Sequence, residues 1–142
     1  MKEPIWLSRA AVLAMHADSV RLFGGSDGLR DASLLESALA RPQHLFAYEQ
    51  PDLCRLAAAY GHGIAKNHPF VDGNKRVAFL ATTVFLERNG LTFTAPEAHA
   101  VTFVLGLADG TLDEEAFAAW LRDHCGSSRR GPKRSTKRRR PK

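Results

Sequence analysis

Residues 68–76 read HPFVDGNKR, and an apolar run, VAFLATTVFL, follows at residues 77–86. The run is typical of a buried helix, and the pair Asn89-Gly90 after it predicts the helix end. The HPFVDGNKR stretch therefore predicts a tight loop that leads into a helix N-terminus. The unpaired N–H groups and partial positive charge of a helix start attract anions. Because Gly73 allows a close turn and Lys75 and Arg76 add two positive charges, we expect a phosphate ligand.

Two residues of this stretch offer further chemistry. His68 is titratable near neutral pH, although a histidine in isolation, one of six in this chain, is more often structural. Asp72 provides hard oxygen ligands suited to Mg²⁺, although an aspartate here can also be the N-cap of the helix. A base, a metal ligand and a phosphate site within nine residues predict phosphoryl or nucleotidyl transfer.

The remaining residues of the stretch have a structural and a functional interpretation. Lys75 and Arg76 could form a solvated surface pair, but two cations at the positive end of a helix are unfavourable unless an anion compensates them. That conflict favours a phosphate site. Asn74 could support the turn or help to hold the anion. We expect Phe70 to anchor the loop in the core and Pro69 to stiffen it.

The HPFVDGNKR stretch resembles the active-site motif of the Fic/Doc superfamily. Lys75 resembles the Doc (death-on-curing) branch, because Fic enzymes usually carry glycine at that place. Residues 28–31, 34–43 and 46–49 also resemble this branch, and the likeness covers residues 4–125. It implies an all-helical fold with His68 as general base and Asp72 as the Mg²⁺ ligand. By the same resemblance the phosphates of ATP are bound by Gly73, Asn74, Lys75 and Arg76, with Lys66 as a weaker candidate.

The resemblance also implies a function. It describes a toxin of a type II toxin–antitoxin pair that transfers phosphate from ATP to a hydroxyl of a translation elongation factor. A small antitoxin, partly disordered when free, would hold the enzyme inactive. Residues 43–49 would correspond to a flap that positions a target segment by backbone pairing, or they could be a plain connector. Three alternatives remain: AMP transfer, a nucleic-acid-binding regulator, and a catalytically inactive scaffold.

The charge of the chain is unevenly distributed. Nine of its 20 Lys and Arg residues lie in residues 127–142, which contain no acid. The rest of the chain carries 11 bases against 15 acids, so its net charge is −4 although the whole chain has +5. We therefore predict a catalytic domain at residues 1–125 and a disordered basic tail at 126–142. The tail could contact nucleic acid non-specifically, but without interleaved aromatics base stacking is not supported.

Other features predict the compartment. The first residues include no long apolar stretch, and the run at 77–86 is too short to span a bilayer. Cys54 and Cys125 form no disulfide framework or metal pattern. We therefore expect a cytoplasmic protein without a membrane anchor.

Helical signals dominate the chain, so we predict an all-α bundle around a central buried helix at about residues 73–89. Further helices are expected from Ser8 to Phe23, from Asp31 or Ser33 to Pro42, from Pro51 towards His68, from Pro96 to about Ala108, and from Thr111 onward. Capping-box spacing pairs Ser33 with Glu36 and Thr111 with Glu114. Residues 43–50 are predicted to be irregular or extended, and residues 91–94 to be a short extended piece.

Overall fold

A computed structural model of the protein describes residues 2–127. Over that range the chain forms six α-helices and two short strands, which confirms the predicted all-α class. In chain order these elements are α1 (Arg9–Phe23), α2 (Ala32–Glu49), α3 (Leu53–Asn67), α4 (Asn74–Arg88), β1 (Leu91–Phe93), α5 (Glu97–Asp109), α6 (Glu114–Asp123) and β2 (Cys125–Ser127).

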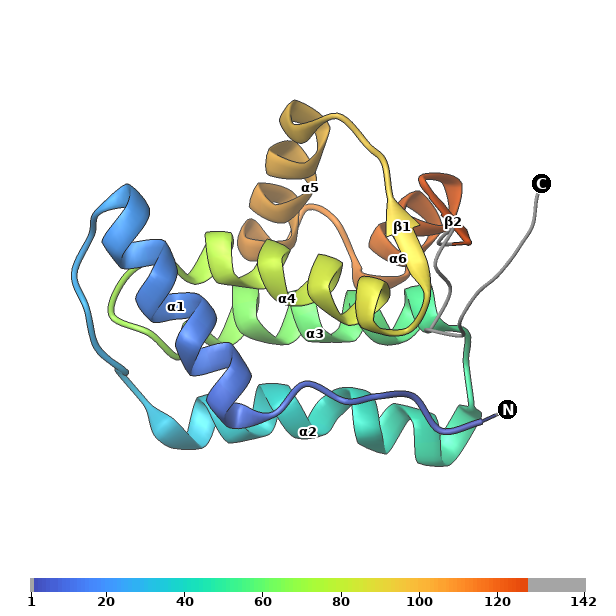
Figure 1. The fold of residues 1–142 in the computed structure, drawn as a ribbon, viewed down its shortest axis with the longest axis horizontal. Helices are drawn as coiled ribbons and strands as arrows, with labels where there is room; N and C mark the ends of the chain where they lie inside the picture. The colour runs from blue at the N-terminus through green and yellow to red at the C-terminus, as the bar shows by residue number, and fades with distance from the viewer. Residues whose placement is uncertain (1, 128–142) are drawn as a thin grey trace, which may run out of the picture.

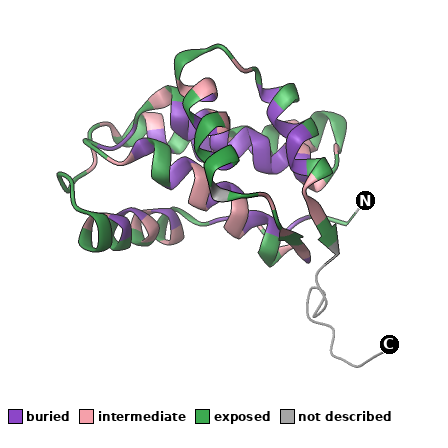
Figure 2. Ribbon diagram, turned by 90° about the horizontal axis from the view of Figure 1, so that it is seen from above, coloured by how far each residue is buried: buried purple, intermediate pink, exposed green. Residues whose placement is uncertain are grey.

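Two helices, α3 and α4, run side by side through the middle of the molecule (Figure 1). Helix α3 packs against α2, α4, α5 and α6, and α4 packs also against α1, α5 and β1. Tyr60 and Ile64 of α3 and Phe85 of α4 are fully buried, and the buried residues gather on the inner faces of the helices (Figure 2). The predicted central helix is therefore confirmed, but α3 shares the centre with it.

Small residues let α3 approach its neighbours closely. A Cβ atom at Gly61 would lie 2.5 Å from Thr82 Oγ1 of α4, and one at Gly63 would lie 3.2 Å from the Cα and Cβ of Ala38 in α2. Larger side chains at these positions would push the helices apart. Gly61 thus sets the separation of α3 from α4, the two helices whose ends carry the site, and Gly63 sets that of α3 from α2.

The boundaries of α4 agree with the sequence prediction. Gly73 is its N-cap in the left-handed region, with φ 80°, and Asn89 is its C-cap. The Asn89 side chain donates to the carbonyl oxygens of Ile5 and Phe85 and accepts from the Ile5 N–H. This residue therefore ends the helix and also fastens the N-terminal segment to it.

The predicted end of α2 at Pro42 is wrong. The helix continues through Pro42 and ends when Gln50 adopts a left-handed conformation, with φ 48°. An internal proline removes one helical hydrogen bond, but the two turns beyond it bring Leu45 and Phe46 against the core. Phe46 lies edge-on to Trp6, with ring centroids 5.7 Å apart. Residues 43–49 are thus helical, and their backbone groups are not free to pair with a target strand as a flap would.

The helix caps follow the sequence at several places and depart from it at others. Ser8 caps α1 as predicted, and Asp31, rather than Ser33, caps α2. Asp113 caps α6 by accepting from the Ala116 N–H, so the predicted capping box of Thr111 and Glu114 is wrong. Asp52 likewise caps α3, and Pro51 lies just outside that helix. In each corrected case an aspartate carboxylate, a strong N-cap acceptor, has the position.

The two strands form a small antiparallel sheet in which Leu91 pairs with Ser127 and Phe93 with Cys125. The strand at residues 91–93 confirms the predicted extended piece. Gly126 and Ser127 were predicted to belong to the tail, but they are part of β2. The rest of the predicted tail lies outside the described residues. No helix of the described part is long and apolar enough to cross a membrane.

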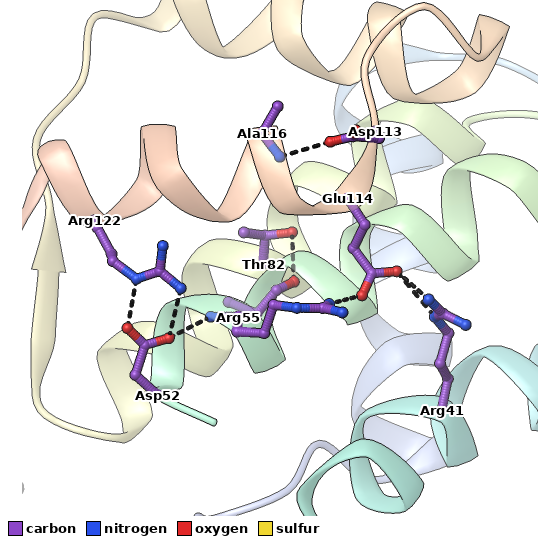
Figure 3. A network of polar contacts seen from close by, with 9 residues as sticks. Arg41, Asp52, Arg55, Thr82, Asp113, Glu114, Ala116 and Arg122 are labelled. Atoms are coloured by element: carbon purple, nitrogen blue, oxygen red, sulfur yellow. Dashed lines mark hydrogen bonds and ion pairs between the residues drawn. The ribbon is translucent and has the colours of Figure 1, made fainter. Parts of the chain in front are cut away.

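A network of ion pairs joins α2, α3 and α6 (Figure 3). The buried Glu114 carboxylate accepts hydrogen bonds from both Arg41 and Arg55. Beside it, the Arg122 guanidinium donates to Asp52 at 2.5 Å and 3.1 Å. These hydrogen bonds lower the pKa of Asp52 below its usual value. Glu114, which is not part of a capping box, instead connects three helices.

Candidate active site

The predicted loop connects the C-terminus of α3 to the N-terminus of α4 (Figure 1). His68 is the C-cap of α3 and has a left-handed backbone, with φ 50° and ψ 56°. Gly73, at the other end of the loop, also has positive φ. Two reversals within six residues bring the side chains of His68 and Asp72 to one surface, where both are exposed.

Phe70 anchors the loop in the core, as predicted. Its side chain is 1% exposed and stacks on the His16 ring, with centroids 4.0 Å apart and an interplanar angle of 7°. Pro69 is buried beside it. The loop is therefore held by the packing of Pro69 and Phe70 against the core, while His68 and Asp72 remain at the surface.

Asn74 fastens the turn with both ends of its side-chain amide. Its Oδ1 accepts from the Phe70 N–H at 2.9 Å, and its Nδ2 donates to the Phe70 carbonyl at 2.9 Å. The side chain is buried. The amide thus supports the turn, and the group that Asn74 can still offer to an anion is its backbone N–H.

The Asp72 carboxylate accepts two backbone hydrogen bonds beside the start of α4. Its Oδ1 accepts from the Gly73 N–H at 2.9 Å and its Oδ2 accepts from the Ser26 N–H at 3.2 Å. A Cβ atom at Gly25 would lie 2.8 Å from Oδ2, so a glycine is needed there. The interpretation of Asp72 as the N-cap is wrong, because Gly73 has that position. The carboxylate is exposed, and each oxygen retains a lone pair for a cation.

An open cavity of about 480 Å³ lies over this loop. Five predicted site residues line it together with His68, namely Asp72, Gly73, Asn74, Lys75 and Arg76. Phe23, Gly24, Gly25 and Val71 form its other walls. The structure therefore gathers the candidate base, the candidate metal ligand and the candidate phosphate-binding residues around one space.

The N-terminus of α4 faces this cavity without a side-chain cap. Within residues 2–127, four other helices have one, from Ser8, Asp31, Asp52 and Asp113. The first N–H groups of α4, from Asn74 to Arg76, are thus left for a ligand. A helix start with free N–H groups and two neighbouring cations is suited to a phosphate.

The two cations of the site are held differently. The Lys75 side chain is exposed and lies between two cavities. Arg76 places its guanidinium over the Phe23 ring, 4.6 Å from the centroid, and donates to Ser19 Oγ at 3.4 Å. Stacking on an aromatic ring limits the directions that the guanidinium can take. Arg76 is therefore partly preorganised by α1, and Lys75 is free to move.

Lys66 is not brought to this cavity. Its ammonium lies near the turn between α5 and α6, 3.5 Å from the place of a Cβ atom at Gly110. Lys66 also lowers the pKa of Asp109 in that turn, although the hydrogen bonds from Thr111 contribute more. The position of Lys66 thus gives no support to the predicted nucleotide contact.

The residues present fit a magnesium ion that is shared with a nucleotide. Among the described residues, no group of three or more His, Cys, Asp or Glu side chains could hold a metal without help. Mg²⁺ however retains several waters and often takes one or two carboxylates together with substrate phosphates. Asp72, beside the α4 N-terminus, is a donor of that kind.

Sequence reasoning missed several residues that shape the site. The sequence gives His16 no role in the loop, but its Nε2 donates to the Asp72 carbonyl oxygen at 2.8 Å. Arg30 donates to carbonyls at the end of α3, and the Val71 N–H donates to the Gly28 carbonyl. These partners lie 37 or more residues away in sequence. Only the likeness of residues 28–31 to the Doc branch could have indicated Gly28 and Arg30, and nothing indicated His16.

The helical scaffold places at the start of α4 a cavity that is suited to a phosphorylated ligand. The chain belongs to the Fic/DOC family, whose sequence model matches residues 6–86. It is 34% identical over 124 residues to "Protein kinase doc" of Escherichia phage P1, a match that covers 86% of this chain and 97% of that protein. It is also 46% identical over 77 residues to "Toxin Doc" of Mycolicibacterium smegmatis, covering 51% and 58% of the two chains. Within the family the chain is therefore similar to Doc toxins.

Proposed function

We propose that this protein transfers the γ-phosphate of ATP to a hydroxyl group of a translation elongation factor and so arrests translation. The single observation that carries the proposal is the uncapped start of α4, which opens into the same cavity as His68 and Asp72. The name of the phage P1 relative, a protein kinase, supports phosphate transfer. The name of the Mycolicibacterium smegmatis relative, a toxin, supports the arrest of growth.

The residues divide the reaction between them. The N–H groups at the start of α4 and the cations of Lys75 and Arg76 bind the phosphates. Asp72 would hold a Mg²⁺ ion, which supplies positive charge against the triphosphate when bound. The exposed His68 imidazole takes the proton of the target hydroxyl, whose oxygen forms the new bond to the γ-phosphorus as the bond to the β-phosphate oxygen breaks. ADP leaves, and the imidazolium returns its proton to water.

Labelled ATP tests this proposal. The purified protein is incubated with a cell extract and with ATP labelled at either the α- or the γ-phosphate. We expect label in one target protein from γ-labelled ATP alone, and no label with His68→Ala or Asp72→Ala. Label from α-labelled ATP would instead show AMP transfer, the alternative that Lys75 disfavours. Transfer by Asp72→Ala at the wild-type rate would refute the role of Asp72 in metal binding.

Besides the elongation factor, we propose a second partner for this protein. It is a small antitoxin whose disordered segment folds on this protein and holds it inactive. An apolar groove beside Lys75 and Arg76 supports a docked segment there, because Val101 and Leu105 of α5 are 54% and 46% exposed along it. A segment in this groove would lie next to the phosphate-binding cations. We place the protein in the cytoplasm, where ATP and elongation factors are found.

The other class of function, a nucleic-acid-binding regulator, depends on the basic tail. Deletion of residues 128–142 distinguishes the regulator from the kinase. It removes nine of the 20 Lys and Arg residues and none of the residues that line the cavity. We expect the shortened protein to remain toxic when expressed, and full-length His68→Ala to be harmless. Loss of all toxicity on deletion, with toxicity kept by His68→Ala, would favour the regulator.

A further inference from the structure

We propose that Arg30 is a positioning residue that holds the His68 imidazole where it can accept a proton. The inference rests on the function proposed above, because it concerns the residue to which we assign the role of general base. Arg30 lies in the connection between α1 and α2, 38 residues before His68, at the same end of the molecule as the α3–α4 loop (Figure 1).

Arg30 donates to three successive carbonyl groups at the end of α3 and just beyond it, the last of which also accepts from the Asp31 N–H. Its Nε donates to the His68 carbonyl at 2.7 Å, and its Nη2 donates to the Asn67 carbonyl at 2.9 Å. Its backbone N–H donates to the Pro69 carbonyl at 2.7 Å. The last carbonyls of a helix have no partner within the helix, so the Arg30 side chain supplies hydrogen-bond donors that α3 itself lacks at its end.

The backbone of His68 needs such support. A non-glycine residue in the left-handed region is sterically strained, and this conformation persists where its surroundings hold it in place. Among the described residues, Gln50 is the other non-glycine residue with positive φ. The planar guanidinium of Arg30 donates along two fixed directions, and thereby fixes the orientation of the peptide groups on both sides of the His68 Cα atom.

The imidazole has no other support in the described part of the chain. The described residues make no hydrogen bond to either ring nitrogen of His68, whose side chain is exposed on the cavity wall. Its position therefore follows from its backbone, whose N–H donates to the Ile64 carbonyl and whose carbonyl accepts from Arg30. A misplacement of about 1 Å can lower a rate roughly 100-fold, so loosening this turn should affect the chemical step.

Steady-state kinetics of phosphate transfer test the inference in three variants. We expect Arg30→Gln to lower kcat by about 10- to 100-fold with little change in KM for ATP, because the start of α4 still holds the phosphates. Arg30→Lys should recover part of the loss, since an ammonium donates to carbonyls but lacks the fixed fork. Arg21→Gln is the matched control, because Arg21 pairs with Asp18 on the surface of α1. Equal kcat values for Arg30→Gln and Arg21→Gln would overturn the proposal, as would a rise in KM alone.

Histidine NMR tests the same inference without any transfer reaction. With ¹³C-labelled histidine, and the His68 signal assigned through His68→Ala, Arg30→Gln should shift or broaden the His68 signal. The signals of His44, His99 and His124, which lie on other elements, should stay in place. An unchanged His68 signal in folded Arg30→Gln, or in Arg30→Lys if the first variant does not fold, would overturn the positioning role. Absence of transfer by the wild type would refute the proposed function alone.

Discussion

Asn74 is the residue in which the structural and the functional interpretation of the loop meet. Its side chain closes the turn on the Phe70 backbone, while its own N–H is one of those that α4 offers to the cavity. We predict that Asn74→Ala destabilises the fold by roughly 1–3 kcal/mol, because the buried Phe70 N–H loses its acceptor. Chemical denaturation measures this loss. A variant as stable as the wild type would show that the amide does not fasten the turn.

Lys75 should behave in the opposite way. A cation in the first turn of a helix opposes the helix dipole, by about 0.3–1 kcal/mol. We predict that Lys75→Gln makes the ligand-free protein slightly more stable and weakens ATP binding. Thermal denaturation and calorimetric titration with ATP, in the presence of Mg²⁺, give the two quantities. A variant that loses stability while binding ATP as before would contradict the assignment of Lys75 to a phosphate site.

The loop itself could be predicted from nine residues, because its turns, its anchor and its charged groups are local. His16 and Arg30 could not be found in this way. Their contacts with the loop depend on how α1 and the connection after it pack against α4. The residues next to His16 and Arg30 in sequence carry no sign of such a partner, because the contacts form only when distant segments pack together.

At the scale of elements, Glu114 joins three helices through Arg41 and Arg55. We predict that Glu114→Ala lowers the free energy of unfolding by roughly 3–5 kcal/mol, because it leaves the largely buried Arg55 without its partner. Glu115→Ala is the matched control, because Glu115 is the next residue and is exposed. Removal of its carboxylate should change the free energy of unfolding by less than about 0.5 kcal/mol. Similar losses in both variants, measured by urea denaturation, would count against the network.

The ion pair between Asp52 and Arg122 gives stability a pH dependence. Its hydrogen bonds hold the pKa of Asp52 below the usual 3.8, so the ionised carboxylate stabilises the folded state. This contribution is complete above about pH 3.8 and is lost as the pH falls through the lowered pKa of the folded protein.

Asp52→Asn tests this dependence, because asparagine still caps α3 but carries no charge. We expect the wild type to melt at a higher temperature than the variant near neutral pH, and the difference to shrink below about pH 3.8. A difference that is the same at neutral and at strongly acidic pH would show that the cap alone, and not the ion pair, stabilises this corner.

Element boundaries were predictable where a local signal acted alone. Ser8 and Asn89 mark their helix ends in the structure as they do in the sequence. Pro42 failed as a stop because burial of Leu45 and Phe46 in the next turns outweighs one lost hydrogen bond. The predicted N-cap at Thr111 was wrong because Asp113, two residues later, is a stronger acceptor. With Asp113 as the cap, Glu114 lies in the first turn of α6, where it pairs with Arg41 and Arg55.

At the scale of the whole molecule, the candidate active site lies at one end of the helical bundle. Helices α3 and α4 contribute buried residues to the core along their length, and the loop between them brings the site to the surface where α1 ends (Figure 1). The family resemblance could be recognised from sequence because its motif is contiguous. The walls of the cavity, from Phe23 to Gly25, could not, because they come from a segment more than 40 residues away.

The central claim is that the start of α4 binds the phosphates of ATP. A crystal structure of the protein with a non-hydrolysable ATP analogue and Mg²⁺ tests it most directly. We predict phosphate oxygens within about 3 Å of the backbone N–H groups of residues 74–76, and Mg²⁺ on the Asp72 carboxylate. A triphosphate bound elsewhere, with these N–H groups in water, would contradict the account.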